Sequence, residues 1–158
     1  MVAGPRSAAA TEHFAIPLPL PPQLPGLEVQ VDRIESLRPD IPVPLQAGGT
    51  ARGYREHLVT GEVQVLECTD TGEPIAVLGG QFIYVAAWLD ASALQRLLQT
   101  ACTLENIATL KMPDGLRRRA TATETFWFNY SGQQQVLDGQ SYPPLSVTRQ
   151  VHGDPNSP

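Results

Sequence analysis

The most regular pattern in this chain is the alternation of apolar and polar residues between His57 and Val85. A period of two places one face of a strand on a core and the other in water, so this stretch predicts two extended segments. The link over 69–74 carries Asp, Gly and Pro, which form turns. Gly79 and Gly80 within the second segment predict a kink in that strand. A long hairpin bent at its centre is typical of a curved sheet or small barrel.

Further strands are expected on both sides of this hairpin. Leu27–Leu37 alternates well, Leu116–Tyr130 is rich in threonines and aromatic residues, and Leu145–Val151 is the last apolar stretch. Six or seven strands and no internal repeat follow from this pattern. We therefore expect an all-β fold, either a small antiparallel β-barrel or a strongly curved sheet, with at most one helix and a proline-rich N-terminal arm.

The segment after the hairpin supports two interpretations. Leucines and alanines between Asp90 and Lys111 form a helical stripe, and Asp90 is suited to be its N-cap. The same residues also alternate as a strand would. We expect a helix over 91–100 and leave 101–112 open.

The front of the chain is unusually rich in proline. Phe14–Gly26 carries proline at every second or third position, which forbids a helix and favours extended, polyproline-like chain. It is either a docking ligand for a partner module or an arm lying on the domain's own surface or a neighbouring subunit, and the arm is favoured. We divide the chain into a disordered tail and arm over 1–26, a single β-barrel-like domain over 27–151, and a polar tail over 152–158.

Composition and charge narrow the function classes. A net charge of −5 and a pI near 5.1 argue against nucleic acid or an anionic membrane as the main partner. No apolar window is long enough for a membrane span and no signal peptide is visible, so the expected location is the cytoplasm. Cys68 and Cys102 give neither a disulfide framework nor zinc spacing. The sequence has no P-loop, dinucleotide, HExxH or GxSxG motif, and we expect no cofactor and no metal.

Aromatic side chains and one acid are the candidate binding groups. Tyr84, Trp88, Trp127 and Tyr130 could stack on a ligand or donate hydrogen bonds at a barrel mouth, although filling the core is their commoner role. Glu124 shares a strand face with Phe126 and Phe128. If that face lined a cavity, burial would raise the pKa of its carboxyl. Otherwise that face is solvated and Trp127 packs inside, which we favour.

The segment Val65–Val85 resembles the paired-strand signature of the allene oxide cyclase-like barrels. The matching residues are a D-x-x-G turn followed by a Gly-x-Phe strand that ends in a β-branched and Tyr run: Asp70, Gly72, Gly80, Phe82 and Tyr84. Family members include bacterial pericyclases that form spirotetronate or decalin rings from linear polyketides, and they are typically dimeric.

This resemblance implies a cofactor-independent cyclase that folds a small apolar molecule into a reactive shape and promotes a pericyclic ring closure of Diels–Alder type. It also implies a homodimer. The catalytic candidates are then Tyr84, Trp127, Glu124 and Tyr130. The substrate-binding candidates are Phe82, Trp88, Phe126 and Phe128.

Two non-enzymatic alternatives stay open. An amphipathic helix after a twisted sheet, an acidic surface and the Pro143–Pro144–Leu145 segment are similar to the export chaperone SecB, a holdase. The other alternative is a ligand carrier with a lipocalin-like barrel. A closed apolar cavity would favour the cyclase or the carrier, and an open groove would favour the chaperone.

Overall fold

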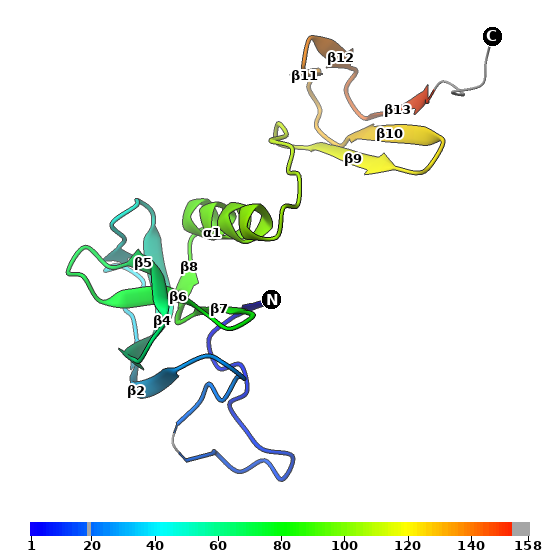
Figure 1. Ribbon diagram of the computed structural model, residues 1–158. Helices are drawn as coiled ribbons and strands as arrows, with labels where there is room; N and C mark the ends of the chain where they lie inside the picture. The colour runs from blue at the N-terminus through cyan, green and yellow to red at the C-terminus, as the bar shows by residue number, and fades with distance from the viewer. Residues whose placement is uncertain (19, 153–158) are drawn as a thin grey trace. The chain divides into compact units, whose positions relative to one another are not determined.

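Short strands and a single helix make up the regular structure of the described residues, 1–18 and 20–152, in the computed structural model (Figure 1). The expectation of a mostly β fold with at most one helix is confirmed. Where one β-rich domain was expected over 27–151, the chain divides into two units, Met1–Ala108 and Thr109–Pro158. We call these unit 1 and unit 2. Apart from His152, the polar tail expected over 152–158 lies outside the described residues.

Unit 1 contains two sheets and the helix. The first sheet has the strand order β1-β7-β6-β5, and in the second β4 pairs with β2, β3 and β8. The bounds are β1 Val2–Ala3, β2 Val29–Ser36, β3 Val43–Pro44, β4 Thr50–Thr60, β5 Gln64–Cys68, β6 Pro74–Gly79, β7 Phe82–Val85 and β8 Ala87–Leu89. The chain crosses between the sheets at Ala86, whose N–H donates to Ile75 of the first sheet and whose carbonyl accepts from Glu56 of the second.

The stretch 57–85 forms two successive hairpins instead of one kinked hairpin. Gly61 and its neighbours end β4, so the apolar alternation passes through a turn that the pattern did not reveal. Gly80 is also a turn residue, because Gly79 pairs with Phe82 and the chain reverses between them. Gly80 has a φ of +54°, and a Cβ there would lie 2.9 Å from the Pro25 carbonyl oxygen. Glycine is therefore required by a tight turn and by the close approach of the arm.

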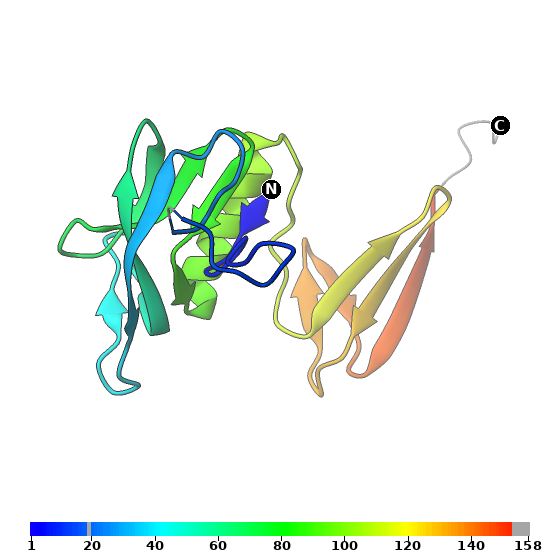
Figure 2. The same ribbon diagram turned by 90° about the horizontal axis from the view of Figure 1, so that it is seen from below.

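The helix α1, Ala91–Leu104, confirms the prediction for 91–100 and extends it by one turn. Asp90 is the N-cap, and its carboxylate accepts from the N–H of Ala93 at 2.9 Å. Leu97 packs against β6 and β7 in a cluster with Ala76, Ile83 and Val85. The helix thus covers one face of the first sheet, as Figure 2 shows.

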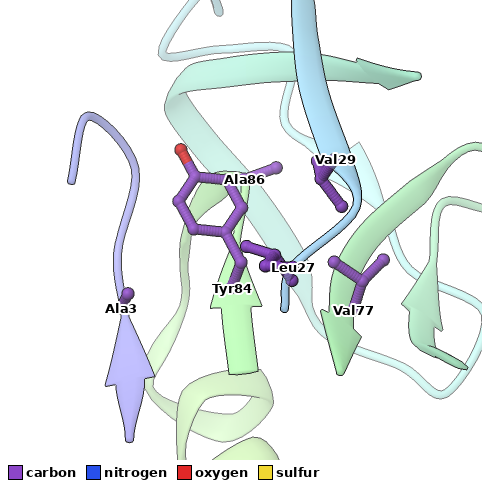
Figure 3. Close-up of a cluster of buried hydrophobic side chains, with 6 residues drawn as sticks. All are labelled: Ala3, Leu27, Val29, Val77, Tyr84 and Ala86. Atoms are coloured by element: carbon purple, nitrogen blue, oxygen red, sulfur yellow. The ribbon is translucent and has the colours of Figure 1, made fainter. Parts of the chain in front are cut away.

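The N-terminal segment before the arm was expected to be a disordered tail, but it begins with a strand of unit 1. β1 pairs in parallel with β7, and Ala3 is buried in a cluster with Leu27, Val29, Val77, Tyr84 and Ala86 (Figure 3). The expected arm lies on the domain's own surface, where the carbonyl of Pro21 accepts from the N–H of Val31. Phe14 and Leu18 nevertheless remain exposed.

Unit 2 contains a three-stranded sheet and a hairpin. The sheet order is β13-β10-β9, and β11 pairs with β12. The bounds are β9 Leu116–Ala120, β10 Glu124–Asn129, β11 Gln135–Leu137, β12 Gln140–Tyr142 and β13 Ser146–Val151. The stretch expected as one strand over 116–130 is a hairpin that turns at 121–123. Its core consists of Leu116, Trp127 and Tyr142.

The predicted barrel is not found. The described strands belong to four separate open sheets, and two of them lie in each unit. Alternating apolar residues specify which face of a strand is buried but not which strand lies beside it, so the pattern could not distinguish closure from separate sheets.

Candidate functional site

The most distinctive polar group of unit 1 is the carboxylate of Glu56, in the middle of β4. Only 3% of Glu56 is exposed. One carboxylate oxygen, Oε1, accepts from the Tyr54 hydroxyl at 3.0 Å and from the backbone N–H of Arg6 at 3.0 Å. The other, Oε2, accepts from the Tyr84 hydroxyl. These three donors replace the water that a buried carboxylate loses.

Both tyrosines are held in their neutral, donating form. Burial raises the pKa of the Tyr84 hydroxyl well above its usual range, and its hydrogen bond to Glu56 raises it further. The same two causes raise the pKa of Tyr54 to about 12. Figure 3 shows the Tyr84 ring among apolar side chains, with its hydroxyl oxygen pointing away from Leu27 and Val77. The strand thus presents a carboxylate whose donors keep their protons throughout the physiological range.

A cavity of about 590 Å³ opens above this cluster. The N-terminal segment before β2 lines it through Ala9, Ile16, Leu20 and Pro21, and the second sheet lines it through Val31 and Ile34. Glu56, Tyr54, Arg6 and Arg33 supply its polar groups. The cavity therefore combines apolar walls with a few converging polar groups, the usual composition of a small-molecule site.

The opposite face of β4 carries a second cluster of charged groups. The Arg55 guanidinium donates to the Glu73 carboxylate at 2.5 Å. His57 lies between two carboxylates, 3.4 Å from Glu73 through Nδ1 and 3.0 Å from Glu35 through Nε2. Alternation along the strand explains why Arg55 and His57 share this face while Glu56 occupies the other.

Arg55 dominates the electrostatics of this second cluster. Its hydrogen bond to Glu73 holds the pKa of that carboxyl below its usual value, and its charge and that of His57 act in the same direction. The Arg55 side chain is 6% exposed, and among the described residues its Nε has no hydrogen-bond partner. Glu73 is therefore a fixed anion and not a proton donor near neutral pH.

The aromatic candidates of unit 1 are placed apart from one another. Tyr84 is fully buried, and it belongs to the Glu56 cluster. Trp88 on β8 is 57% exposed, and its ring lies 5.7 Å from that of Tyr54. Phe82 begins β7 beside the turn at Gly80.

The other five candidates all lie on or beside β10 in unit 2. Trp127 faces the core, with its ring 5.0 Å from that of Tyr142. Phe126 and Phe128 stack on the opposite, half-exposed face, and the ring of Phe128 stacks on that of the exposed Tyr130. Glu124 accepts from Nε of Arg149 at 2.9 Å.

These positions show which face of β10 is buried. The favoured interpretation, with Trp127 inside and Glu124 on the outer side, is confirmed. The eight candidates fall in two units, three in the first and five in the second. The roles expected of them stay predictions.

Sequence-based reasoning missed Glu56, Tyr54 and Arg55. A signal was present, because Arg55, Glu56 and His57 are three consecutive ionisable residues inside a strand-like stretch. In a strand with one buried face, such a run places at least one charge toward the core, where it needs partners.

Neither a metal-ligand cluster nor a membrane-spanning helix is found in the part of the chain that the structure describes. Among residues 1–18 and 20–152, no set of three or more His, Cys, Asp or Glu side chains is arranged to hold a metal ion. Over the same residues, no helix has the length and apolar character needed to cross a bilayer.

Known proteins provide an independent comparison. No protein-family model matches the sequence. A β-galactosidase from Thermus thermophilus is 34% identical over an alignment of 132 residues, and the match covers 80% of this chain and 20% of that protein. This chain is similar to one part of a β-galactosidase. It spans about a fifth of the length of the curated relatives that it matches.

Solved structures give the same result. The β-galactosidase of the psychrophilic Marinomonas ef1 matches 94% of this chain and 24% of its own, with a TM-score of 0.82 and 25% identity. The β-galactosidase of Halorubrum lacusprofundi matches 97% of this chain and 27% of its own, with a TM-score of 0.79 and 20% identity. Both matches include nearly the whole chain, so the fold of both units recurs in those enzymes.

These comparisons correct the functional prediction. The resemblance to the allene oxide cyclase-like family is wrong, as are the polyketide cyclase of Diels–Alder type and its chaperone and lipocalin-like alternatives. The resemblance rested on 65–85, and the structure shows why it misled. The matched residues Asp70, Gly72 and Gly80 lie in the turns of two successive hairpins, where Asp and Gly are favoured in many unrelated folds.

Proposed function

We propose that this chain forms one region of a β-galactosidase, and that it shapes and stabilises the enzyme without carrying the hydrolytic step. The similarity to the Thermus thermophilus enzyme over 80% of this chain supports the first half of the proposal. The single observation that carries the second half is the state of the carboxyl groups in the candidate site.

Glycoside hydrolysis uses two carboxyl groups on either side of the scissile bond, one of which must donate a proton. The acid of such a pair has a raised pKa. The hydrogen bond from Arg55 lowers the pKa of Glu73, and hydrogen bonds from Ala93, Ser92 and Thr50 lower that of Asp90, so neither carboxyl group has the raised pKa of a proton donor. Glu56 already accepts from three protein donors.

The nearest approach to a carboxylate pair is Glu35 and Glu73, with His57 between them. A sugar placed between these two groups would have to displace the imidazole. Arg55 would also keep Glu73 ionised. This geometry suits a series of structural ion pairs that connects β2, β4 and the β5–β6 turn. It supports a scaffolding role.

The test uses a transplant. The 132 aligned residues of the Thermus thermophilus β-galactosidase are replaced by the matching residues of this chain, and hydrolysis of 2-nitrophenyl β-D-galactoside is measured. We expect the chimera to hydrolyse the substrate, the same enzyme without this region to lose activity, and the isolated chain to show none.

Two results would contradict the proposal. Turnover by the isolated chain that Glu56→Gln abolishes would place the hydrolytic step here. Full activity and unchanged melting of the enzyme without this region would remove the supporting role.

A further inference from the structure

We infer that one face of the three-stranded sheet of unit 2 is a docking face for a part of the β-galactosidase that lies outside this chain, and that the surface docked there is acidic around an apolar strip. The docking face is the side of β9, β10 and β13 opposite Trp127. The inference rests on the proposed function, because it takes this chain as one region of that enzyme.

The strand pairing shows which side chains share the docking face. Along β10, Phe126 and Phe128 alternate with the buried Trp127. Residues that lie opposite each other in an antiparallel pair point to the same side of the sheet. The pairing therefore adds residues from both neighbouring strands: Arg117 and Arg119 from β9, and Val147, Arg149 and Val151 from β13. The ion pair between Glu124 and Arg149 lies on this face.

The centre of the docking face is aromatic and is open to solvent. The ring of Phe128 lies 6.5 Å from that of Phe126 and 6.1 Å from that of the exposed Tyr130. Val147 is 62% exposed and Val151 is 65% exposed. The β11–β12 hairpin packs with the core on the other side of the sheet. A continuous apolar patch of this kind is typical of an interaction surface.

The charges on the docking face favour an acidic partner surface. Three arginines, Arg117, Arg119 and Arg149, and one carboxylate, Glu124, give it a net charge of +2. Glu124 is paired with Arg149, and no carboxylate of residues 1–18 or 20–152 forms an ion pair with Arg117 or Arg119. Aromatic residues and arginine are enriched in protein interfaces, and carboxylates of the partner would complement the two remaining charges.

The size of the docking face favours a partner within the same polypeptide. Its strands have five or six residues. Three such strands cover roughly 14 Å by 20 Å, a footprint on the order of 300 Å². Separate molecules in a stable complex bury about 800 Å² each. A covalently joined partner needs less contact, because the joining chain keeps it at an effective concentration of about millimolar.

A β-galactosidase supplies such a partner. The match covers 20% of the Thermus thermophilus enzyme and 24% of the Marinomonas ef1 chain, so most of each protein lies outside the matched region. If this chain is one region of such an enzyme, the docking face is covalently joined to a much larger body. We therefore assign the docking face to that body.

Photo-cross-linking identifies the partner. The test uses the isolated chain and the chimera in which this chain replaces the matching region of the Thermus thermophilus β-galactosidase. The photoreactive residue p-benzoyl-L-phenylalanine is placed at Val147 on the docking face or at Val136 on β11, a control valine that is 55% exposed. We expect position 147 of the chimera to cross-link to the Thermus thermophilus part, and position 136 to give no such product.

A charge variant tests whether the partner surface is acidic. Arg119→Gln should lower the melting temperature of the chimera by about 2–4 °C and leave that of the isolated chain unchanged. High salt should reduce the difference. The matched control is Arg118→Gln on the same strand. Arg118 lies over the Trp127 ring on the other side of the sheet, so its loss should affect the chimera and the isolated chain equally.

Several results would overturn the inference. Cross-links from position 147 to a second copy, recognised by a doubled mass, or to the transplanted chain itself would give the docking face another occupant. The absence of any cross-link from position 147 in a chimera that is active would remove the docking face and leave the proposed function standing. Equal effects of Arg119→Gln on the chimera and the isolated chain would argue against an acidic partner surface.

The reverse outcome is also distinguishable. Cross-linking does not require activity. If the Thermus thermophilus enzyme without this region is fully active and melts unchanged, while position 147 of the chimera still cross-links to that enzyme, the proposed supporting role is contradicted and the docking face is retained.

Discussion

Unit 1 and unit 2 bury polar groups by different means. Unit 1 buries two ionisable side chains, Arg55 and Glu56, which lie on opposite faces of β4. Each forms hydrogen bonds with residues that are distant in the sequence. Unit 2 buries a neutral amide, Asn129, whose Nδ2 donates to three backbone carbonyls and whose Oδ1 accepts from Ser131.

The apolar cores of the two units also differ in size. The described residues of unit 1 form three clusters of buried side chains, whereas those of unit 2 form one cluster of three residues. A short chain encloses little volume relative to its surface, so it cannot offset the cost of burying a charge and relies on large aromatic side chains. The larger unit can hold a buried carboxylate next to a cavity, and the smaller unit cannot.

The largest expected loss of stability is in the core of unit 2. Trp127→Ala removes one of three core side chains and should lower the free energy of unfolding of unit 2 by about 3–5 kcal/mol, enough to lose its structure. Hydrogen exchange of peptides from 109–152 measures this. Phe126→Ala, on the half-exposed face of the same strand, should cost far less; an equal loss of protection would show that the apolar core is not on the Trp127 side.

The buried carboxylate of unit 1 gives the next effect. Glu56→Ala leaves the Tyr84 hydroxyl and the Arg6 N–H without an acceptor, so unit 1 should lose about 3 kcal/mol of stability. In a Trp127→Phe background, Trp88 is the remaining tryptophan and its fluorescence follows urea unfolding of unit 1. Glu62→Ala, an exposed neighbour on the same segment, serves as control, and a similar loss there would argue against a specific role of the Glu56 cluster.

The turn at Gly80 tests whether the arm depends on close backbone approach. Gly80→Val places a β-branched residue at a φ of +54° and its Cβ against the Pro25 carbonyl, which should cost about 2 kcal/mol. Gln81→Ala, the next residue in the turn, should change stability by less than about 0.5 kcal/mol. Thermal melting followed through Trp88 distinguishes the two, and equal melting temperatures would contradict the tight turn.

The smallest effect is at the helix start of unit 1 and depends on pH. Hydrogen bonds from Ala93, Ser92 and Thr50 hold the pKa of Asp90 far below its usual value. Because the folded pKa is lower than the unfolded one, the ionised carboxylate stabilises the fold above about pH 4, and this contribution is lost as the pH falls toward the folded pKa.

Asp90→Ala should therefore cost about 1 kcal/mol at pH 7, and the difference should shrink steadily below pH 4. Urea unfolding at a series of pH values measures it. Asp32→Ala, at an exposed position on β2, is the control for the loss of an aspartate. A cost that is independent of pH would assign the effect to lost packing instead of the carboxylate.

Local patterns sufficed for individual elements. The alternation over 27–37 and 145–151 correctly predicted β2 and β13, and the leucine stripe after Asp90 predicted the helix with its cap. The face of β10 that carries Trp127 was also predictable, since a charged residue on the other face identifies the solvated side. In each case the information lies within a few residues of the element itself.

Tertiary structure alone decided how these elements combine. Whether strands close into a barrel or form separate sheets depends on which edges meet, and alternation does not encode that. The Glu56 cluster shows the same limit, because its donors come from residues 6, 54 and 84 and only the folded chain brings them together. The sequence of a strand can indicate that a charged side chain is buried. The hydrogen-bond partners that offset the cost of burying it lie elsewhere in the chain.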